Sequence, residues 1–152
     1  MLYMTSDHEK ELFVHLICFR GRVGNTSDLV AWADSVIASE EYSDVIADVS
    51  LLGSKTDKEV LNHLESINPS GDYLAAVERL LPRLARLVES DHTQLKFVCS
   101  YLSDVYEDSE VQLPEKYEFM GRAEDDYFIA WERYTDLTVE SLQSDILKNL
   151  VA

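Results

Sequence analysis

Carboxylates and tyrosines are concentrated between Asp104 and Asp126, where Lys116 and Arg122 are the only basic residues. Carboxylates attract a cationic partner over a long range, and tyrosines supply rigid contact area at a small entropic cost. This segment therefore predicts a binding face for a basic protein. The predicted partner-binding residues are Asp104, Tyr106, Glu107, Asp108, Glu110, Tyr117, Glu118, Glu124, Asp125, Asp126 and Tyr127, and Tyr101 and Glu115 lie among them.

The same segment has a simpler interpretation, in which the carboxylates keep the protein dissolved and the tyrosines belong to the core. Composition does not separate the two interpretations, so both stay open. A calcium loop of the EF-hand type does not fit. Starting from Asp104, position twelve is Glu115, but position three is Tyr106 and position six is Ser109 instead of glycine.

Three potential metal ligands, His8, Glu11 and His15, recur along one face of an expected helix. A metalloprotease helix has two histidines four residues apart with a glutamate between them, and this spacing differs. His15 also lies between Val14 and Leu16, which favours a buried histidine that is hydrogen-bonded. We therefore predict no metal site and no cofactor here.

The remaining motifs do not indicate catalysis. Arg79, Arg83 and Arg86 share a helix face, but the neighbouring acids favour ion pairing over phosphate binding. The segment 21–26 lacks the Gly-Lys-Ser/Thr ending of a phosphate loop and reads as a turn between helices. Cys18 and Cys99 lie in apolar runs, as inert core thiols do. We predict that the protein is not an enzyme.

The overall charge sets the kind of partner. The 152 residues include 29 acidic and 13 basic side chains, a formal net charge of -16. Such a field repels phosphates, which argues against direct binding of nucleic acid. The first residues lack the basic start of a signal peptide, and the densest apolar run, 12–19, is too short to span a bilayer. We expect a cytoplasmic protein that does not bind membranes.

Helix start signals and apolar stripes recur along most of the chain. Ser6 to Glu9, Thr56 to Glu59 and Asp91 to Gln94 resemble capping boxes, and Thr26 to Asp28 can cap another helix. Stripes at helical spacing predict helices that begin near residues 6, 26, 43, 56, 72, 91 and 138. Pro82 lies within the fifth of these, so we expect a kink or a break there.

The segment 110–137 allows two structures. Residues 116–120 alternate and 127–134 are aromatic, which suits a β-hairpin whose loop is 121–126, yet Tyr127, Trp131 and Tyr134 also share a helical face. The prediction is a mainly α, single domain over 1–152. It is a bundle or an array of αα-hairpins with six or seven helices, with the option of one β-hairpin near residues 115–134.

In composition the chain resembles bacterial immunity proteins, which mask nuclease toxins, and proteins that imitate DNA. No family motif supports the resemblance. We expect an inhibitor module that binds and masks a basic partner protein, such as a nuclease toxin. The alternatives are a helical scaffold that self-associates and, less favoured, an enzyme or small-molecule binder built around His8, Glu11 and His15 or around Arg79. The sequence does not indicate an oligomeric state.

Overall fold

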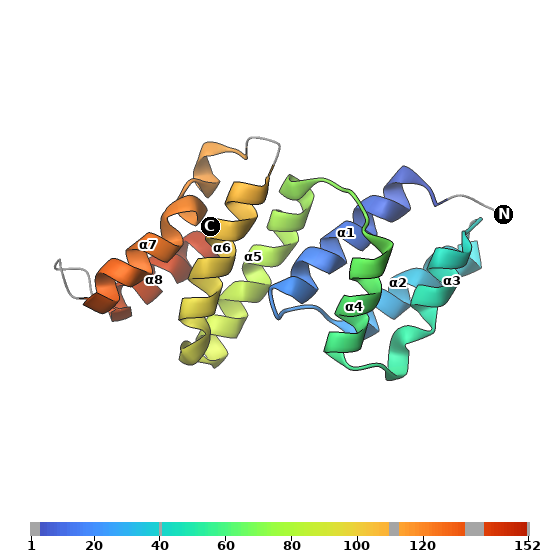
Figure 1. The fold of residues 1–152 in the computed structure, drawn as a ribbon, viewed down its shortest axis with the longest axis horizontal. Helices are drawn as coiled ribbons and strands as arrows, with labels where there is room; N and C mark the ends of the chain where they lie inside the picture. Colours follow the sequence, from blue (N-terminus) through green and yellow to red (C-terminus); the bar gives the residue numbers. More distant parts are fainter. Residues whose placement is uncertain (1–3, 40, 110–112, 133–138, 152) are drawn as a thin grey trace. The chain divides into compact units, whose positions relative to one another are not determined.

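Helices make up the regular structure of the described part of the chain. The computed structural model describes residues 4–39, 41–109, 113–132 and 139–151, the side chains of residues 131, 132 and 139 excepted. Within these ranges there are eight α-helices and no strand (Figure 1). The α-helices are α1 (Ser6–Arg20), α2 (Thr26–Ser39), α3 (Asp44–Ser50), α4 (Asp57–Ile67), α5 (Tyr73–Ser90), α6 (Leu95–Asp108), α7 (Phe119–Glu132) and α8 (Val139–Val151), and the short 3-10 helices are η1 (Leu52–Ser54), η2 (His92–Gln94) and η3 (Glu115–Tyr117).

The chain divides into two compact units, residues 1–76 and 77–152. The first unit holds α1 to α4 and the start of α5, and the second holds the rest of α5 and all that follows. The all-helical class is confirmed for the described residues, with slightly more helices than predicted. The single domain over 1–152 stays a prediction.

Local capping explains where the helices of the first unit begin. Thr56 accepts a hydrogen bond from the Glu59 N–H at 3.2 Å, so the N-cap predicted at Thr56 is confirmed. The first capping prediction is wrong by one residue, because Thr5 and not Ser6 caps α1 by accepting from the His8 N–H. At α2 the cap is Asn25, whose side chain accepts from the Asp28 N–H at 2.9 Å.

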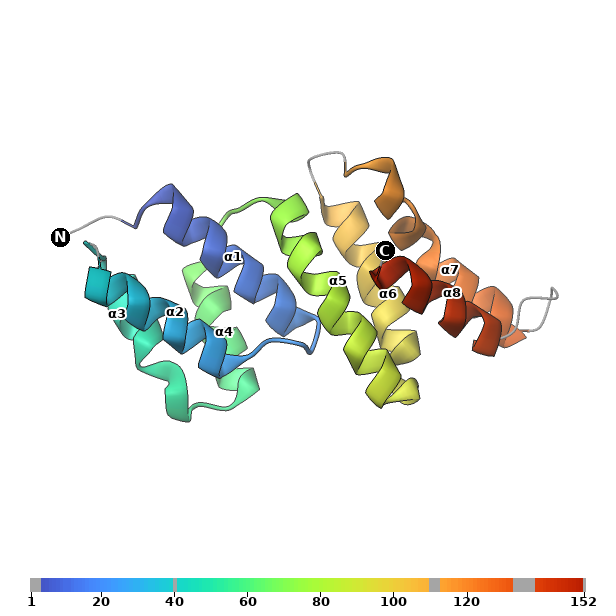
Figure 2. The ribbon, with the colours of Figure 1, turned by 180° about the vertical axis from the view of Figure 1, so that it is seen from behind.

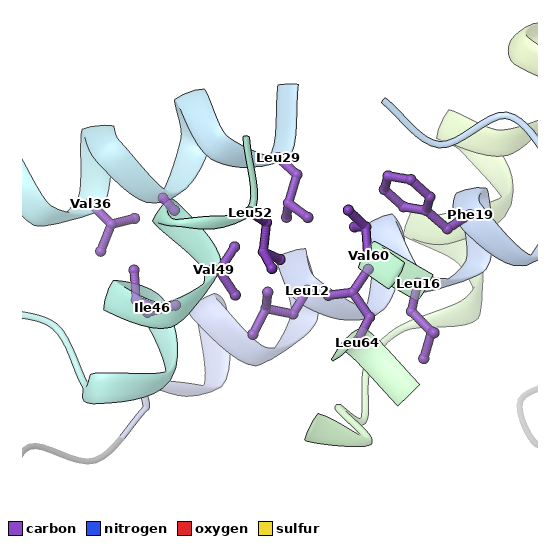
Figure 3. Packing of buried hydrophobic residues seen from close by; sticks show 11 residues of the cluster. Leu12, Leu16, Phe19, Leu29, Val36, Ile46, Val49, Leu52, Val60 and Leu64 are labelled. Atoms are coloured by element: carbon purple, nitrogen blue, oxygen red, sulfur yellow. The ribbon is translucent and has the colours of Figure 1, made fainter. Parts of the chain in front are cut away.

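Four helices and η1 enclose the core of the first unit (Figure 3). Every residue of α1 from Leu12 to Phe19 is buried. The stripe predicted for α2 is Leu29, Trp32, Ala33, Val36 and Ile37. Leu29, Ala33 and Val36 belong to the same cluster, and Trp32 and Ile37 pack against it partly buried. The cluster consists of Leu12, Leu16, Phe19, Leu29, Ala33, Val36, Ile46, Val49, Leu52, Val60 and Leu64.

In the second unit, α5 continues through Pro82 as one helix, so of the expected kink or break the break is wrong. Pro82 has no N–H, so the bond from residue 82 to the Glu78 carbonyl is absent. The helix persists because its apolar face is buried on both sides of the proline, with Val77 and Leu80 before it and Leu84 after it. Pro82 itself is exposed. Packing of the stripe therefore outweighs the loss of one hydrogen bond.

Of the two structures left open for this segment, the β-hairpin near residues 115–134 is wrong for the described part, residues 115–132. Residues 115–117 form η3 and residues 119–132 form α7, so the segment 121–126, which was expected to be a hairpin loop, lies inside a helix. Met120, Ala123 and Ala130 are buried at helical spacing, and α7 packs mainly against α6 and also against α8 (Figure 2). Burial of this stripe selects the helix over the alternating strand pattern.

Candidate functional site

The predicted acidic segment is organised by a close contact between α6 and α7. The hydroxyl of Ser103 donates to the Met120 carbonyl at 3.0 Å and accepts from the Glu124 N–H at 3.1 Å. The Ser103 side chain is buried, so these bonds join the two helices in a dry environment. Asp104 follows Ser103 directly. Acidic positions that are twenty residues apart in the sequence, Asp104 and Glu124, are thus brought onto neighbouring helix turns.

Most of the predicted carboxylates are on the surface of this helix pair. We call the following eight residues the α6–α7 acidic surface: Asp104, Glu107, Asp108, Glu115, Glu118, Glu124, Asp125 and Asp126. The first seven are exposed and Asp126 is half-buried. Glu110 lies outside the described residues. The α6–α7 acidic surface is therefore available to solvent and to a partner.

The charges of this surface are not neutralised by nearby basic side chains. Within the described ranges, no ion pair joins any of its carboxylates to a lysine or an arginine. Ion pairs do form in the first unit, for example between Arg20 and Glu65 at 2.9 Å. Lys116, which lies within the acidic segment, places its ammonium 5.0 Å from the centre of the Tyr117 ring instead. A surface of uncompensated like charge has a strongly negative potential.

The tyrosines differ in their availability. Tyr117 is buried, with 6% of its surface exposed, so it belongs to the core and not to a contact surface. Tyr106 is half-buried and packs against Gly121 of α7, and Tyr127 is also half-buried. Tyr101 stacks on Phe97, with ring centroids 5.7 Å apart. For Tyr117, then, the interpretation of the tyrosines as core residues holds.

An exposed aromatic residue that the sequence prediction missed lies on α7. The Phe128 side chain is 59% exposed. Phe128 follows Asp125 by three residues and Glu124 by four, so all three share one face of the helix. No local pattern singled it out, because the buried stripe of Met120, Ala123 and Ala130 that leaves Phe128 outside is known only from the packing of α7.

Asp126 lies in a different environment from its neighbours. It lines an open groove of about 360 Å³ between α7 and α8, together with Arg122, Asp145 and Lys148. It also acts on a core thiol. Burial, and then the negative charge of Asp126, raise the pKa of Cys99 to about 12. Cys99 is therefore protonated at neutral pH, as expected for an inert core cysteine.

The first unit carries a second acidic stretch, which the sequence analysis did not single out. Residues 1–76 contain 13 acidic and 5 basic side chains, and residues 77–152 contain 16 and 8, so each unit has a net charge of -8. No lysine or arginine occurs from Val23 to Ser54. Exposed carboxylates in this stretch include Asp34, Glu41 and Asp48. The acidity is therefore shared between the two units, and it is not confined to the predicted segment.

The histidines of α1 are part of the interior. His8 and His15 are buried, and both rings contact Trp32 of α2, with centroids 6.1 and 6.3 Å away. Nε2 of His15 lies 3.2 Å from a carboxylate oxygen of Glu11. In the part of the chain that the structure describes, no three His, Cys, Asp or Glu side chains are arranged to hold a metal ion.

Fold and surface together define a class: an all-α protein, in its described part, with uncompensated carboxylates on α6 and α7. Comparison with family models, with curated proteins and with solved structures finds no match. None of the described helices combines the length and hydropathy of a bilayer-spanning segment.

Proposed function

We propose that this protein is a binding module that masks a basic surface of a partner protein, such as the substrate channel of a nuclease toxin. The observation that carries the proposal is the α6–α7 acidic surface, with seven exposed carboxylates and no ion pair to a lysine or arginine among the described residues. Such a surface attracts a cationic partner and competes with the phosphates that the partner would otherwise bind.

The rigid contact between α6 and α7 supports this proposal. The Ser103 hydrogen bonds and the close approach of Tyr106 to Gly121 join the two helices that carry the carboxylates. A preorganised surface loses less conformational entropy on binding than a flexible acidic tail does. A protein that imitates the regular spacing of DNA phosphates needs this rigidity.

The test uses purified nuclease domains with basic substrate channels, assayed for cleavage of duplex DNA in the presence of the full chain. We expect stoichiometric inhibition, and an association rate that falls at least about tenfold between low and physiological salt. Full cleavage at saturating protein, together with association that does not depend on salt, contradicts the proposal.

Two charge variants locate the surface. The first, E124Q/D125N/D126N, removes three negative charges from α7. The second, D34N/E41Q/D48N, removes three from the first unit and is the matched control. We expect the first to slow association more than the second, because charges within the contact act more strongly than charges outside it. Equal slowing by both variants would show that the net charge acts and that the α6–α7 acidic surface is not the docking site.

A further inference from the structure

Phe128 combines exposure with a place inside the acidic surface. At 59% it is among the most exposed large apolar side chains of the described residues, and it shares a helix face with the exposed carboxylates of Glu124 and Asp125. The opposite face of α7 is buried through Met120, Ala123 and Ala130. Phe128 therefore does not contribute to the core, and its ring faces solvent.

We propose that Phe128 is the apolar anchor of the interface, and that the partner is a cationic protein surface with an apolar pocket among its basic side chains. This inference rests on the proposed function and deepens it. Long-range charge mainly sets the rate of encounter, whereas a buried aromatic ring mainly sets the rate of dissociation. An anchor of this kind also distinguishes the proposed surface from one that only imitates DNA, because an imitation of DNA needs carboxylates but no apolar side chain.

Charge complementarity favours a cationic partner at Phe128 over a second copy of the chain. The segment from Asp104 to Asp126 contains nine acidic and two basic residues, a net charge of -7. Self-docking through Phe128 would bring two such segments together, and like charges at an interface are unfavourable. A cationic partner gains attraction where a second copy meets repulsion.

The experiment compares two helical peptides of equal length and charge. Both carry lysine on one face, and the other face carries leucine in the first peptide and glutamine in the second. We expect the full chain to bind the leucine peptide at least about tenfold more tightly than the glutamine peptide, because the leucine peptide dissociates more slowly. F128A should lose this preference, and F128L should keep most of it.

L51A is the matched control, because Leu51 is 74% exposed and lies in the first unit, outside the α6–α7 acidic surface. It should keep the preference for leucine. Thermal unfolding of F128A should match the wild type, since the ring is exposed. Equal affinity of the wild type for the two peptides, or an undiminished preference in F128A, overturns the anchor.

Failure of the anchor and failure of the proposed function give different results. One result would support the acidic surface and contradict the anchor. In that result, E124Q/D125N/D126N slows association with both peptides more than D34N/E41Q/D48N does, and F128A does not change binding. Formation of dimers by the wild type that F128A abolishes also overturns the anchor, in favour of self-association.

Discussion

The ring of Tyr106 lies directly against Gly121: a Cβ atom built on Gly121 would lie 2.8 Å from Cδ1 and 3.1 Å from Cε1 of the ring. Glycine is favoured here because the Tyr106 ring lies so close, and not because of the backbone, since Gly121 has no positive φ angle. The same contact places the carboxylates of α6 beside those of α7. The contact that packs α6 against α7 thus also determines how their charges are arranged.

The variant G121A should therefore destabilise the protein. Alanine gains about 1 kcal/mol in helix propensity, but the added methyl must displace the Tyr106 ring or the helix, at about 1–3 kcal/mol. We expect a net loss of about 1–2 kcal/mol in the free energy of unfolding, measured in urea. G53A is the control, because nothing lies within 4 Å of a Cβ at Gly53. A G121A variant as stable as G53A would contradict the contact.

The Ser103 hydroxyl gives a second prediction. S103A removes one hydrogen bond to the Met120 carbonyl and one from the Glu124 N–H in a buried site. We expect a loss of about 1–2 kcal/mol in unfolding free energy. S66A is the control, because its exposed hydroxyl bonds only the His63 carbonyl of its own helix and should change stability by less than about 0.5 kcal/mol. Equal effects of the two variants would argue against a bridging role for Ser103.

A third prediction concerns acid pH and Glu9. The Ser70 N–H and hydroxyl both donate to Glu9 at 2.8 Å, and these bonds hold the pKa of Glu9 below its ordinary value of 4.5. A lowered pKa in the folded state stabilises the protein above pH 4.5, and this contribution is lost as the pH falls through the folded pKa.

Replacing Glu9 by glutamine should thus lower stability slightly at pH 7, by under about 1 kcal/mol because the site is partly exposed to solvent. The difference from the wild type should shrink as the pH falls below 4.5. Urea unfolding at several pH values measures both effects. E41Q, at an exposed residue of the first unit, serves as the control and should show no such trend. A constant difference across the pH range would contradict the role of the Glu9 carboxylate.

The fourth prediction concerns thiol reactivity. Cys99 is fully buried and its pKa is raised to about 12, so its thiolate is scarce at pH 8. In the variant C18A, where Cys99 is the remaining cysteine, Ellman's reagent should react at least about 100-fold more slowly with the folded protein than with the unfolded protein. Adding D126N should leave this protection in place, because burial is the larger cause. Rapid reaction in the folded state would contradict the buried position.

Local signals account for the parts of the fold that could be predicted. The Thr56 cap and the inward stripe of Leu29, Ala33 and Val36 follow from spacing within one helix, and the structure confirms both. The segment 110–137 could not be assigned, because a short apolar run fits a strand as well as a helix. Contact with α6 decides for the helix, and that contact is not visible in local spacing.

The candidate site, too, could be predicted only in part from the sequence. The carboxylates between Asp104 and Asp126 were found from composition, and the exposure of seven of those that the structure describes follows from the cost of burying charge. Tyrosine carries no comparable rule, since it is common both in cores and at interfaces. Tyr117 proves to be buried and Phe128 exposed, and neither result could be predicted from residue type alone.

By itself, the sequence determined that the chain is helical and where most helices begin. It also determined which stripes face inward and how acidic the protein is. Each of these properties follows from residues within a few turns of one another. The tertiary structure alone decided that Gly121 admits Tyr106, that Ser103 joins α6 to α7 and that Phe128 is left in solvent. The reason is physical: burial of a side chain depends on which distant segment packs against it, and a free energy gained between helices is not encoded in the periodicity of either one.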